Sequence, residues 1–258
     1  LMNLLECQGE DGLIPGHVRH MTESARQTGM YHADWGGNAL QIYYMHGDAA
    51  FLEKAYEPLT RYLEYFQKER DPEGSYLYDV WNQWETGQEY MGRYLIADPK
   101  ADLGDRIRLK GVDATVYIYE LARSLAAMAE ILGKPKSEAL KYRDIADKIK
   151  SAVLEKMWDP DMEMFCDVEP TAMKRSPYKS AVCFYPFFTD IPTESHLGAI
   201  RKHLLNPSEF WTEYPVPSSS LDDPYFDAEP QWKGKRCGCP WNGRVWPMTN
   251  SHVMHALG

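Results

Sequence analysis

The densest group of side chains able to carry out acid–base chemistry lies between residues 78 and 94. This segment, YDVWNQWETGQEYMGRY, contains three carboxylates, three tyrosines, two tryptophans and one arginine. Cleavage of a glycosidic bond needs one carboxylic acid to protonate the leaving oxygen and a second carboxylate to activate water or to attack carbon. Aromatic rings that stack on sugar faces complete such a site. The alternative interpretation is a solvated acidic loop whose tryptophans pack into the core.

A second aromatic segment, residues 210–250, carries four tryptophans, at positions 211, 232, 241 and 246. Its many Pro, Gly and Ser residues exclude a long helix. Trp is rarely exposed in a loop unless it packs inward or contacts a ligand. The segment is therefore either a strap over the core or part of a binding surface, and composition alone does not decide between them.

The elements that must position these loops are helical. Apolar residues recur at three- and four-residue steps over 51–66, where Pro58 predicts a kink or a restart of the helix. The same periodicity predicts helices over 112–132 and 137–157, joined as a hairpin by the turn at 133–136. Three long helical segments thus account for much of the first 157 residues.

Shorter helices are expected in the second half of the chain. The pattern predicts a pair at 180–189 and 193–205, with Thr193 as the N-cap of the second. A last helix is expected over 247–257. Ser137 is the predicted cap of the long helix that follows the 133–136 turn.

Long polar and aromatic connections separate the helices, at 71–94, 159–178 and 206–246. Loops of this length in a compact domain usually bind or catalyse. Helical hairpins whose long loops gather on one side predict an all-α fold of the α/α toroid type, with the site at the loop-rich mouth. Because no linker or charge block divides the chain, residues 1–258 are expected to form a single domain.

Composition excludes several classes of partner. The chain has a formal net charge of −10, which argues against nucleic acid or anionic lipid, and no apolar run is long enough to span a membrane. The histidines and cysteines show no metal-ligand spacing, so neither metal nor cofactor is expected; Cys237-Gly-Cys239 is too tight for a zinc knuckle. The first residues resemble the middle of a helix rather than a signal peptide, so an earlier segment is expected and the compartment stays open.

Several strings resemble, in order along the chain, the motifs of glycoside hydrolase family 63 and the trehalases, the six-hairpin glycosidases. ETGQE followed by MGRY is similar to their ESGWD-then-SRW signature, and WNGRVWPMTN is similar to WRGPVWP-x-x-N. The resemblance covers most of the chain and implies an (α/α)6 barrel that forms a catalytic domain. The matching segments are residues 85–94, 241–250, 210–226 (FWTEYPVPSSSLDDPYF), 8–15 (QGEDGLIP) and 46–48 (HGD).

The resemblance also assigns roles to residues. Glu89 takes the place of the family's catalytic general acid, an Asp, and Arg93 takes the place of an Arg that helps to bind sugar. Gln88 replaces the signature's Trp, so the motif does not fix the substrate. Asp113 is read as an N-terminal helix residue rather than as a ligand. The other residues expected to contact substrate are Asp79, Trp81, Trp84, Glu85, Trp241, Asn242, Gly243 and Trp246.

These families invert the anomeric centre, which implies two carboxyls about 6.5–9.5 Å apart with a water between them. Their general base is a Glu well after the WPxxN string, so the base is expected on a segment after Gly258, and the fragment alone is expected to be inactive. Glu89 must then be protonated. Its pKa is expected to be raised by burial beside Trp84 or Tyr90, or by a neighbouring carboxylate such as Glu85, with Arg93 turned toward the substrate.

The resulting hypothesis is an inverting glycoside hydrolase that acts on an α-linked glucoside or mannoside, as an oligosaccharide or a small glycoside. Two alternatives stay open. A sugar epimerase on the same toroid would transfer protons through paired His. A non-catalytic carbohydrate-binding fragment would bind sugar without hydrolysing it. The sequence indicates neither the natural substrate nor the oligomeric state.

Overall fold

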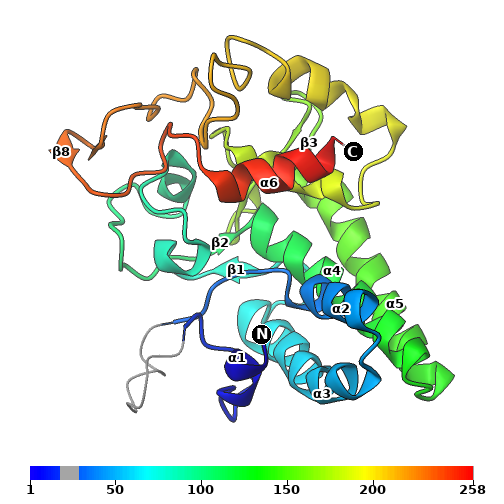
Figure 1. Ribbon diagram of the computed structural model, residues 1–258. Coiled ribbons are helices and arrows are strands. Elements are labelled where there is room, and N and C mark those ends of the chain that lie inside the picture. Colours follow the sequence, from blue (N-terminus) through cyan, green and yellow to red (C-terminus); the bar gives the residue numbers. More distant parts are fainter. Residues whose placement is uncertain (18–28, 258) are drawn as a thin grey trace. The chain divides into compact units, whose positions relative to one another are not determined.

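The computed structural model describes residues 1–17 and 29–257 and shows a mostly helical chain (Figure 1). The chain divides into two compact units. The first comprises Leu1–Tyr78 and Tyr117–Ala152, and the second comprises Asp79–Val116 and Val153–Gly258. No helix within the described residues is both long enough and apolar enough to cross a membrane. Of the histidines considered for a metal site, His20 lies outside the described residues.

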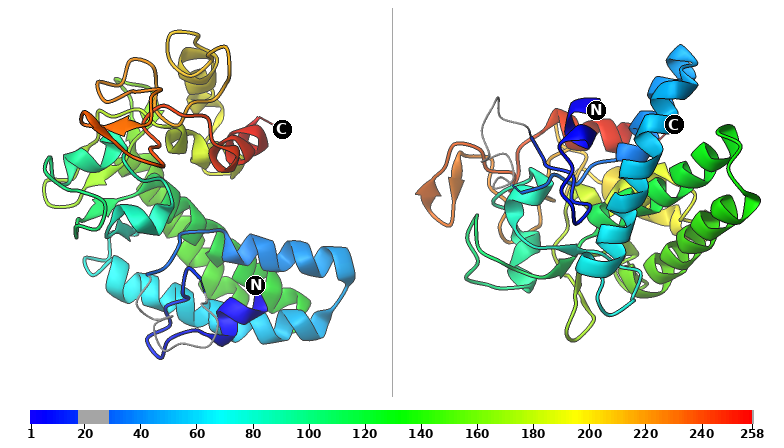
Figure 2. Two further views of the ribbon diagram at one scale, coloured as in Figure 1. Left: turned by 60° about the vertical axis from the view of Figure 1, so that its left-hand side comes forward. Right: turned by 90° about the horizontal axis from the view of Figure 1, so that it is seen from below.

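Helical hairpins build the first unit. Asp34 caps α2, because its carboxylate accepts the Gly37 N–H at 2.7 Å, and Asp48 caps α3 in the same way. Two side-chain bonds join α3 to α5: the Tyr56 hydroxyl donates to Glu138 at 2.6 Å, and the hydroxyls of Thr60 and Tyr142 lie 3.1 Å apart. Figure 2 shows the helices of this unit from two further directions. The helices are α1 (Met2–Glu6), α2 (Trp35–His46), α3 (Ala49–Tyr65), α4 (Val112–Ile131, which starts in the second unit) and α5 (Lys136–Ala152).

The long helices predicted from periodicity are confirmed, with two corrections. Pro58 lies inside α3 without ending it, so the predicted restart is wrong; burial of the residues that follow, such as Leu59, offsets the missing hydrogen bond. Helix α5 begins at Lys136, so Ser137 is inside the helix and is not its cap. The turn has the four residues expected but lies one position earlier, at 132–135, where Gly133 adopts φ 65° after the end of α4.

The second unit contains a small antiparallel sheet that the sequence did not predict. Its order is β1-β2-β5-β6, and Asp79 on β1 faces Lys110 on β2. Each strand is two residues long, too short for alternation of polar and apolar residues to be visible. The sheet joins two of the long connections, because β1 belongs to 71–94 and β5 and β6 belong to 159–178. Strand β2, directly before α4, lies between them in the sheet. Its strands are β1 (Asp79–Val80), β2 (Leu109–Lys110), β5 (Val168–Glu169) and β6 (Lys174–Arg175).

Short helices and hairpins complete this unit. The predicted pair at 180–189 and 193–205 is confirmed, although it forms 3-10 and π turns rather than α-helix, and Thr193 is a cap as expected. The last predicted helix is α6 (Pro247–Ala256), which packs against the 3-10 helix η6 (Ala181–Phe188). The remaining elements are the turns η2 (Phe66–Arg70, first unit), η3 (Gln83–Thr86), η4 (Gly92–Ile96), η5 (Val153–Met157), η7 (Glu194–His196) and η8 (Ile200–Leu204), and the hairpins β3 (Trp158–Asp159) with β4 (Met164–Phe165) and β7 (Gln231–Trp232) with β8 (Lys235–Arg236).

The buried face of α3 is expected to carry much of the stability of the first unit. Leu59 is fully buried, so Leu59→Ala should lower the free energy of unfolding by about 2–5 kcal/mol through lost transfer free energy and a residual cavity. Leu140, on α5, is 60% exposed, and Leu140→Ala is the matched control with an effect below about 0.5 kcal/mol. Urea unfolding measures both; equal losses in the two variants would contradict the assignment of the core.

Candidate active site

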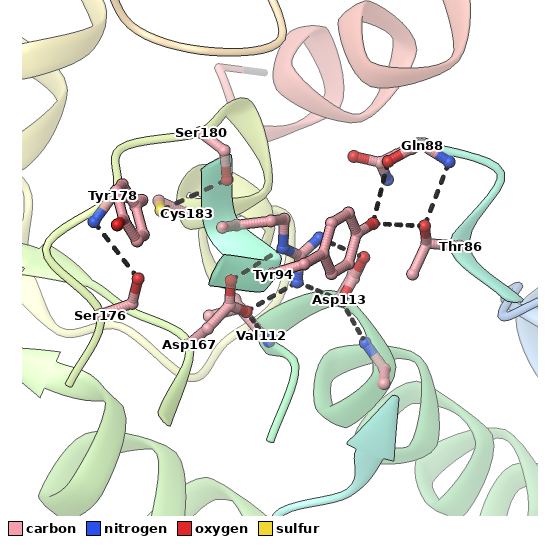
Figure 3. Close-up of polar contacts among 12 residues, drawn as sticks. Thr86, Gln88, Tyr94, Val112, Asp113, Asp167, Ser176, Tyr178, Ser180 and Cys183 are labelled. Atoms are coloured by element: carbon pink, nitrogen blue, oxygen red, sulfur yellow. Dashed lines mark hydrogen bonds and ion pairs between the residues drawn. The ribbon is translucent and has the colours of Figure 1, made fainter. Parts of the chain in front are cut away.

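The loop that contains Glu89 is held by buried hydroxyl and amide groups. The hydroxyls of Thr86 and Tyr94 lie 2.6 Å apart, and Tyr94 also donates to the Gln88 carbonyl at 2.9 Å. The Gln83 side chain accepts the Tyr90 N–H at 2.7 Å. Figure 3 shows Thr86, Gln88 and Tyr94 pointing toward one another. These bonds fix the backbone on both sides of Glu89.

Glu89 is half-buried and lies beside the second aromatic segment. Its carbonyl accepts the Trp241 N–H at 3.0 Å, and the Trp241 ring stacks on Trp246 at 4.3 Å with an angle of 10° between the planes. Burial raises the pKa of the Glu89 carboxyl, whereas its own backbone N–H and the Trp241 side chain act in the opposite direction. A raised pKa of Glu89 agrees with the expectation for a general acid. The aromatic neighbour is Trp241, however, and not Trp84, which is 49% exposed.

The segment from Trp241 to Trp246 packs closely on the preceding loop. The Asn242 amide donates to the carbonyls of Tyr225 and Gln231, each at 3.2 Å. A Cβ added at Gly243 would lie 2.7 Å from the Asp227 carbonyl, so only glycine allows this approach of the two backbones. The close packing explains why Trp241, Asn242 and Gly243 are all buried.

Some polar atoms of the two segments are buried without a hydrogen-bond partner among the described residues. They include Oε1 of Gln88, Oδ1 of Asn242 and Nε1 of Trp246. A buried polar atom without a partner is costly and is therefore uncommon in folded proteins. Both donors and acceptors occur among these atoms, and both kinds of group bind sugar hydroxyls.

Arg93, expected to bind sugar, is paired with two carboxylates of the protein. Its side chain is fully buried, and its guanidinium makes paired hydrogen bonds of 2.7–2.9 Å with both Asp113 and Asp167. Asp113 lies in the first turn of α4, and Asp167 lies between β4 and β5 and also accepts the Val112 N–H at 2.9 Å. Figure 3 shows both carboxylates directed toward a common centre. With every arm of the fork bonded to a carboxylate, Arg93 anchors the Glu89 loop.

Three other residues predicted to bind substrate also have structural partners. Asp79 is buried and pairs with Arg108 at 2.6 Å and with Lys110 at 3.3 Å. Glu85 is buried and accepts the Trp81 N–H at 2.9 Å. The Trp81 ring lies under the Arg106 guanidinium, 3.8 Å from the ring centroid. Residues 79–85 of this loop therefore make contacts within the protein. The following residues bring Glu89 to Trp241 through a backbone hydrogen bond.

Sequence reasoning gave no role to an aromatic group that packs beside Glu89. The Trp232 ring lies 6.4 Å from that of Tyr90 and 5.8 Å from that of Tyr225. Asp223 contacts the same loop, because a Cβ added at Gly92 would lie 3.1 Å from its carboxylate. Burial raises the pKa of Asp223 to about 6. Asp223 belongs to the DDP string of the family-like segment 210–226. The string by itself does not indicate that this carboxyl is buried.

The histidines of the second unit are involved in packing. His252 stacks on Tyr185 at 4.5 Å, and His255 stacks on Phe188 at 5.9 Å. Rings held in aromatic stacks are poorly placed for the paired proton transfers of an epimerase. Among the described residues, no group of three or more His, Cys, Asp and Glu is arranged to hold a metal ion.

A family model described as the mannosylglycerate hydrolase MGH1-like glycoside hydrolase domain matches residues 1–258. The chain is 24% identical to the mannosylglycerate hydrolase of Rubrobacter radiotolerans, over 82% of this chain and 57% of that protein. It is 22% identical to the "Probable mannosyl-oligosaccharide glucosidase" of Schizosaccharomyces pombe, over 80% of this chain and 26% of that protein. The chain thus spans about a quarter of one curated relative and just over half of the other.

A solved structure shows the fold. The family 63 mannosylglycerate hydrolase from Thermus thermophilus, in complex with glucose, matches 99% of this chain and 74% of its own chain with a TM-score of 0.80 at 15% identity. The same enzyme in complex with Tris gives a TM-score of 0.79. The (α/α)6 toroid fold expected from the sequence is confirmed.

Removal of Arg93 should destabilise the second unit strongly. Arg93→Met leaves the buried carboxylates of Asp113 and Asp167 without their counter-charge, so the free energy of unfolding should fall by about 3–5 kcal/mol. The matched control is Arg123→Met, whose partner Glu120 lies 3.8 Å away at a half-exposed position, with an effect below about 0.5 kcal/mol. Urea unfolding of both variants measures these changes. A small loss of unfolding free energy in Arg93→Met would contradict the anchoring role of Arg93.

Asp223 should make stability depend on pH in an unusual direction. Its pKa of about 6 in the fold lies above the ordinary value of 3.8, so its contribution is fully present below pH 3.8 and is lost as the pH rises through 6. Relative to Asp223→Asn, the wild type should lose about 3 kcal/mol between these limits. Asp222→Asn is the control with the opposite slope, because the pKa of Asp222 is lowered. Parallel pH profiles of unfolding for wild type and Asp223→Asn would contradict the prediction.

Proposed function

This chain belongs to the mannosylglycerate hydrolase MGH1-like glycoside hydrolase domain family, and on that basis we propose that it hydrolyses the O-glycosidic bond of an α-linked mannoside or glucoside. The names of the two curated relatives support this substrate class, one a mannosylglycerate hydrolase and the other a glucosidase. Because the chain spans only part of both relatives, the proposal concerns the activity of the complete protein. Residues 1–258 contribute to one catalytic domain in this proposal.

One observation carries the proposal: the carboxyl of Glu89 is half-buried, has a raised pKa and lies beside the stacked rings of Trp241 and Trp246. A general acid must hold its proton at the pH of the reaction, and burial against aromatic residues is one way to achieve this. Unpaired polar atoms of Gln88, Asn242 and Trp246 lie in the same two segments and supply groups for sugar hydroxyls. Acid and binding groups thus occur together.

In the proposed reaction, Glu89 donates its proton to the glycosidic oxygen as the bond to the anomeric carbon breaks. A water molecule attacks that carbon from the opposite face, and a second carboxylate removes the proton of the water. The configuration at the anomeric carbon is inverted, which requires about 6.5–9.5 Å between the two carboxyls. Following the resemblance to the family, we place the second carboxylate on a segment after the WPMTN string.

The test uses Glu89→Gln in the complete protein, with aryl α-mannosides and α-glucosides as substrates. For a poor leaving group such as phenol or an alcohol, kcat should fall by about 10²–10⁴-fold, because no proton reaches the departing oxygen. For 2,4-dinitrophenol, which leaves without protonation, the loss should be far smaller. NMR should detect the β anomer first if the reaction inverts the α substrate.

Glu213→Gln is the control at an exposed carboxyl and should leave both rates unchanged. An equal loss for good and poor leaving groups in Glu89→Gln would remove Glu89 from the acid role, since it would indicate damage to binding or folding. Circular dichroism and urea unfolding of the variant separate these two causes. Full activity of the variant would contradict the proposal outright.

A further inference from the structure

Two thiols separated by a single glycine lie at the end of the β7–β8 hairpin. Cys237 directly follows β8 and is half-buried, whereas Cys239 is exposed, and both are free thiols. Gly238 between them has no atom within 4 Å of an added Cβ, and the chain bends at Gly238 and Cys239. A bend at the middle residue shortens the distance between its neighbours. The two sulfurs are therefore held on one short, accessible turn.

The two thiols differ in their surroundings. The Cys237 N–H donates to the Pro230 carbonyl at 2.9 Å, which fixes the base of the turn. Burial raises the pKa of Cys237, while the Arg244 guanidinium and the Cys239 backbone N–H stabilise its thiolate. Cys239 is the more accessible thiol and is suited to attack first; Cys237, partly covered, is suited to resolve the intermediate. No metal-ligand group of three includes them within the described residues.

We propose that Cys237 and Cys239 form a reversible intramolecular disulfide by exchange with a small-molecule disulfide such as oxidised glutathione. The Cys239 thiolate attacks one sulfur of oxidised glutathione and releases a glutathione thiolate, which gives a mixed disulfide. The Cys237 thiolate then attacks the Cys239 sulfur, and the second glutathione leaves. Two protein thiols are oxidised, one glutathione disulfide is reduced to two glutathiones, and each departing thiolate takes up a proton. A disulfide across so short a loop is strained, so it should be readily reduced again.

The hairpin connects this dithiol to the loop of Glu89. Trp232, on β7, packs against the ring of Tyr90, the residue after Glu89. Tyr90 adopts φ 62°, a conformation that non-glycine residues rarely hold, so its backbone depends on the contacts around it. The Tyr90 hydroxyl also lies close enough to Cys237, Cys239 and Glu89 for their charges to act on it. Disulfide closure should therefore change the rate of hydrolysis; this consequence rests on the proposed function, and the disulfide itself does not.

The experiment equilibrates the complete protein with mixtures of reduced and oxidised glutathione. Acid quenching, alkylation and mass spectrometry of the peptide that contains both cysteines should show loss of two hydrogen atoms and no alkylation, reversed by dithiothreitol. Cys7→Ser removes another exposed thiol and is the matched control, with the same result expected. Cys237→Ser should instead accumulate glutathione on Cys239. Alkylation of both cysteines at every glutathione ratio, or a lasting mixed disulfide in the wild type, would overturn the proposal.

The coupling to the active site has its own readout. In the active enzyme, kcat/KM for an aryl α-glycoside should differ by about threefold or more between the oxidised and reduced forms. The difference should vanish in Cys239→Ser. A disulfide that forms without any change in kcat/KM would overturn the coupling. Absence of hydrolysis in both forms would instead count against the proposed function and would leave the disulfide standing.

Discussion

The buried ion network of Arg93, Asp113 and Asp167 is the interaction on which the site depends. One guanidinium joins three stretches of chain: the Glu89 loop, the first turn of α4 and the connection between β4 and β5. The hydrogen bonds of Thr86, Tyr94 and Gln83 hold the loop internally, and the Arg93 network ties it to the rest of the unit, where the strands are only two residues long. The planar fork of arginine matches two carboxylates at once, which lysine does not achieve. Such a network contributes more to the position of the loop than to the net free energy of folding.

This arrangement explains why Glu89 differs from the other carboxylates of its loop. Burial raises the pKa of Asp79 as it does that of Glu89, but the paired Lys110 and Arg108 oppose the rise, and Glu85 accepts a backbone N–H. The nearest arginine in sequence to Glu89, Arg93, is bound to Asp113 and Asp167. The same pairing that anchors the loop therefore keeps a positive charge away from Glu89. Its pKa can then be raised by burial, as a proton donor requires.

Periodicity predicted the long helices because each buries one continuous apolar stripe, as α3 does with Leu52, Leu59 and Leu63. Motif order predicted that Glu89 would lie near Trp241, which the backbone bond between them agrees with. The pairing of Arg93 was not predicted because its partners Asp113 and Asp167 are 20 and 74 residues away, and no local pattern indicates such pairing. The two-residue strands were missed for a related reason: their pairing is set by tertiary contacts.

A functional site often breaks local rules of folding, and such breaks occur in the two segments of the candidate site. Tyr90 has a positive φ, and buried polar atoms of Gln88 and Asn242 have no partner within the part of the chain that the structure describes. Each feature costs free energy and persists only where the surroundings fix it. Around Glu89 the surroundings do so, through Thr86, Tyr94 and the Arg93 network. If the proposed function is correct, groups placed and desolvated in this way meet the hydroxyls of a sugar without further rearrangement.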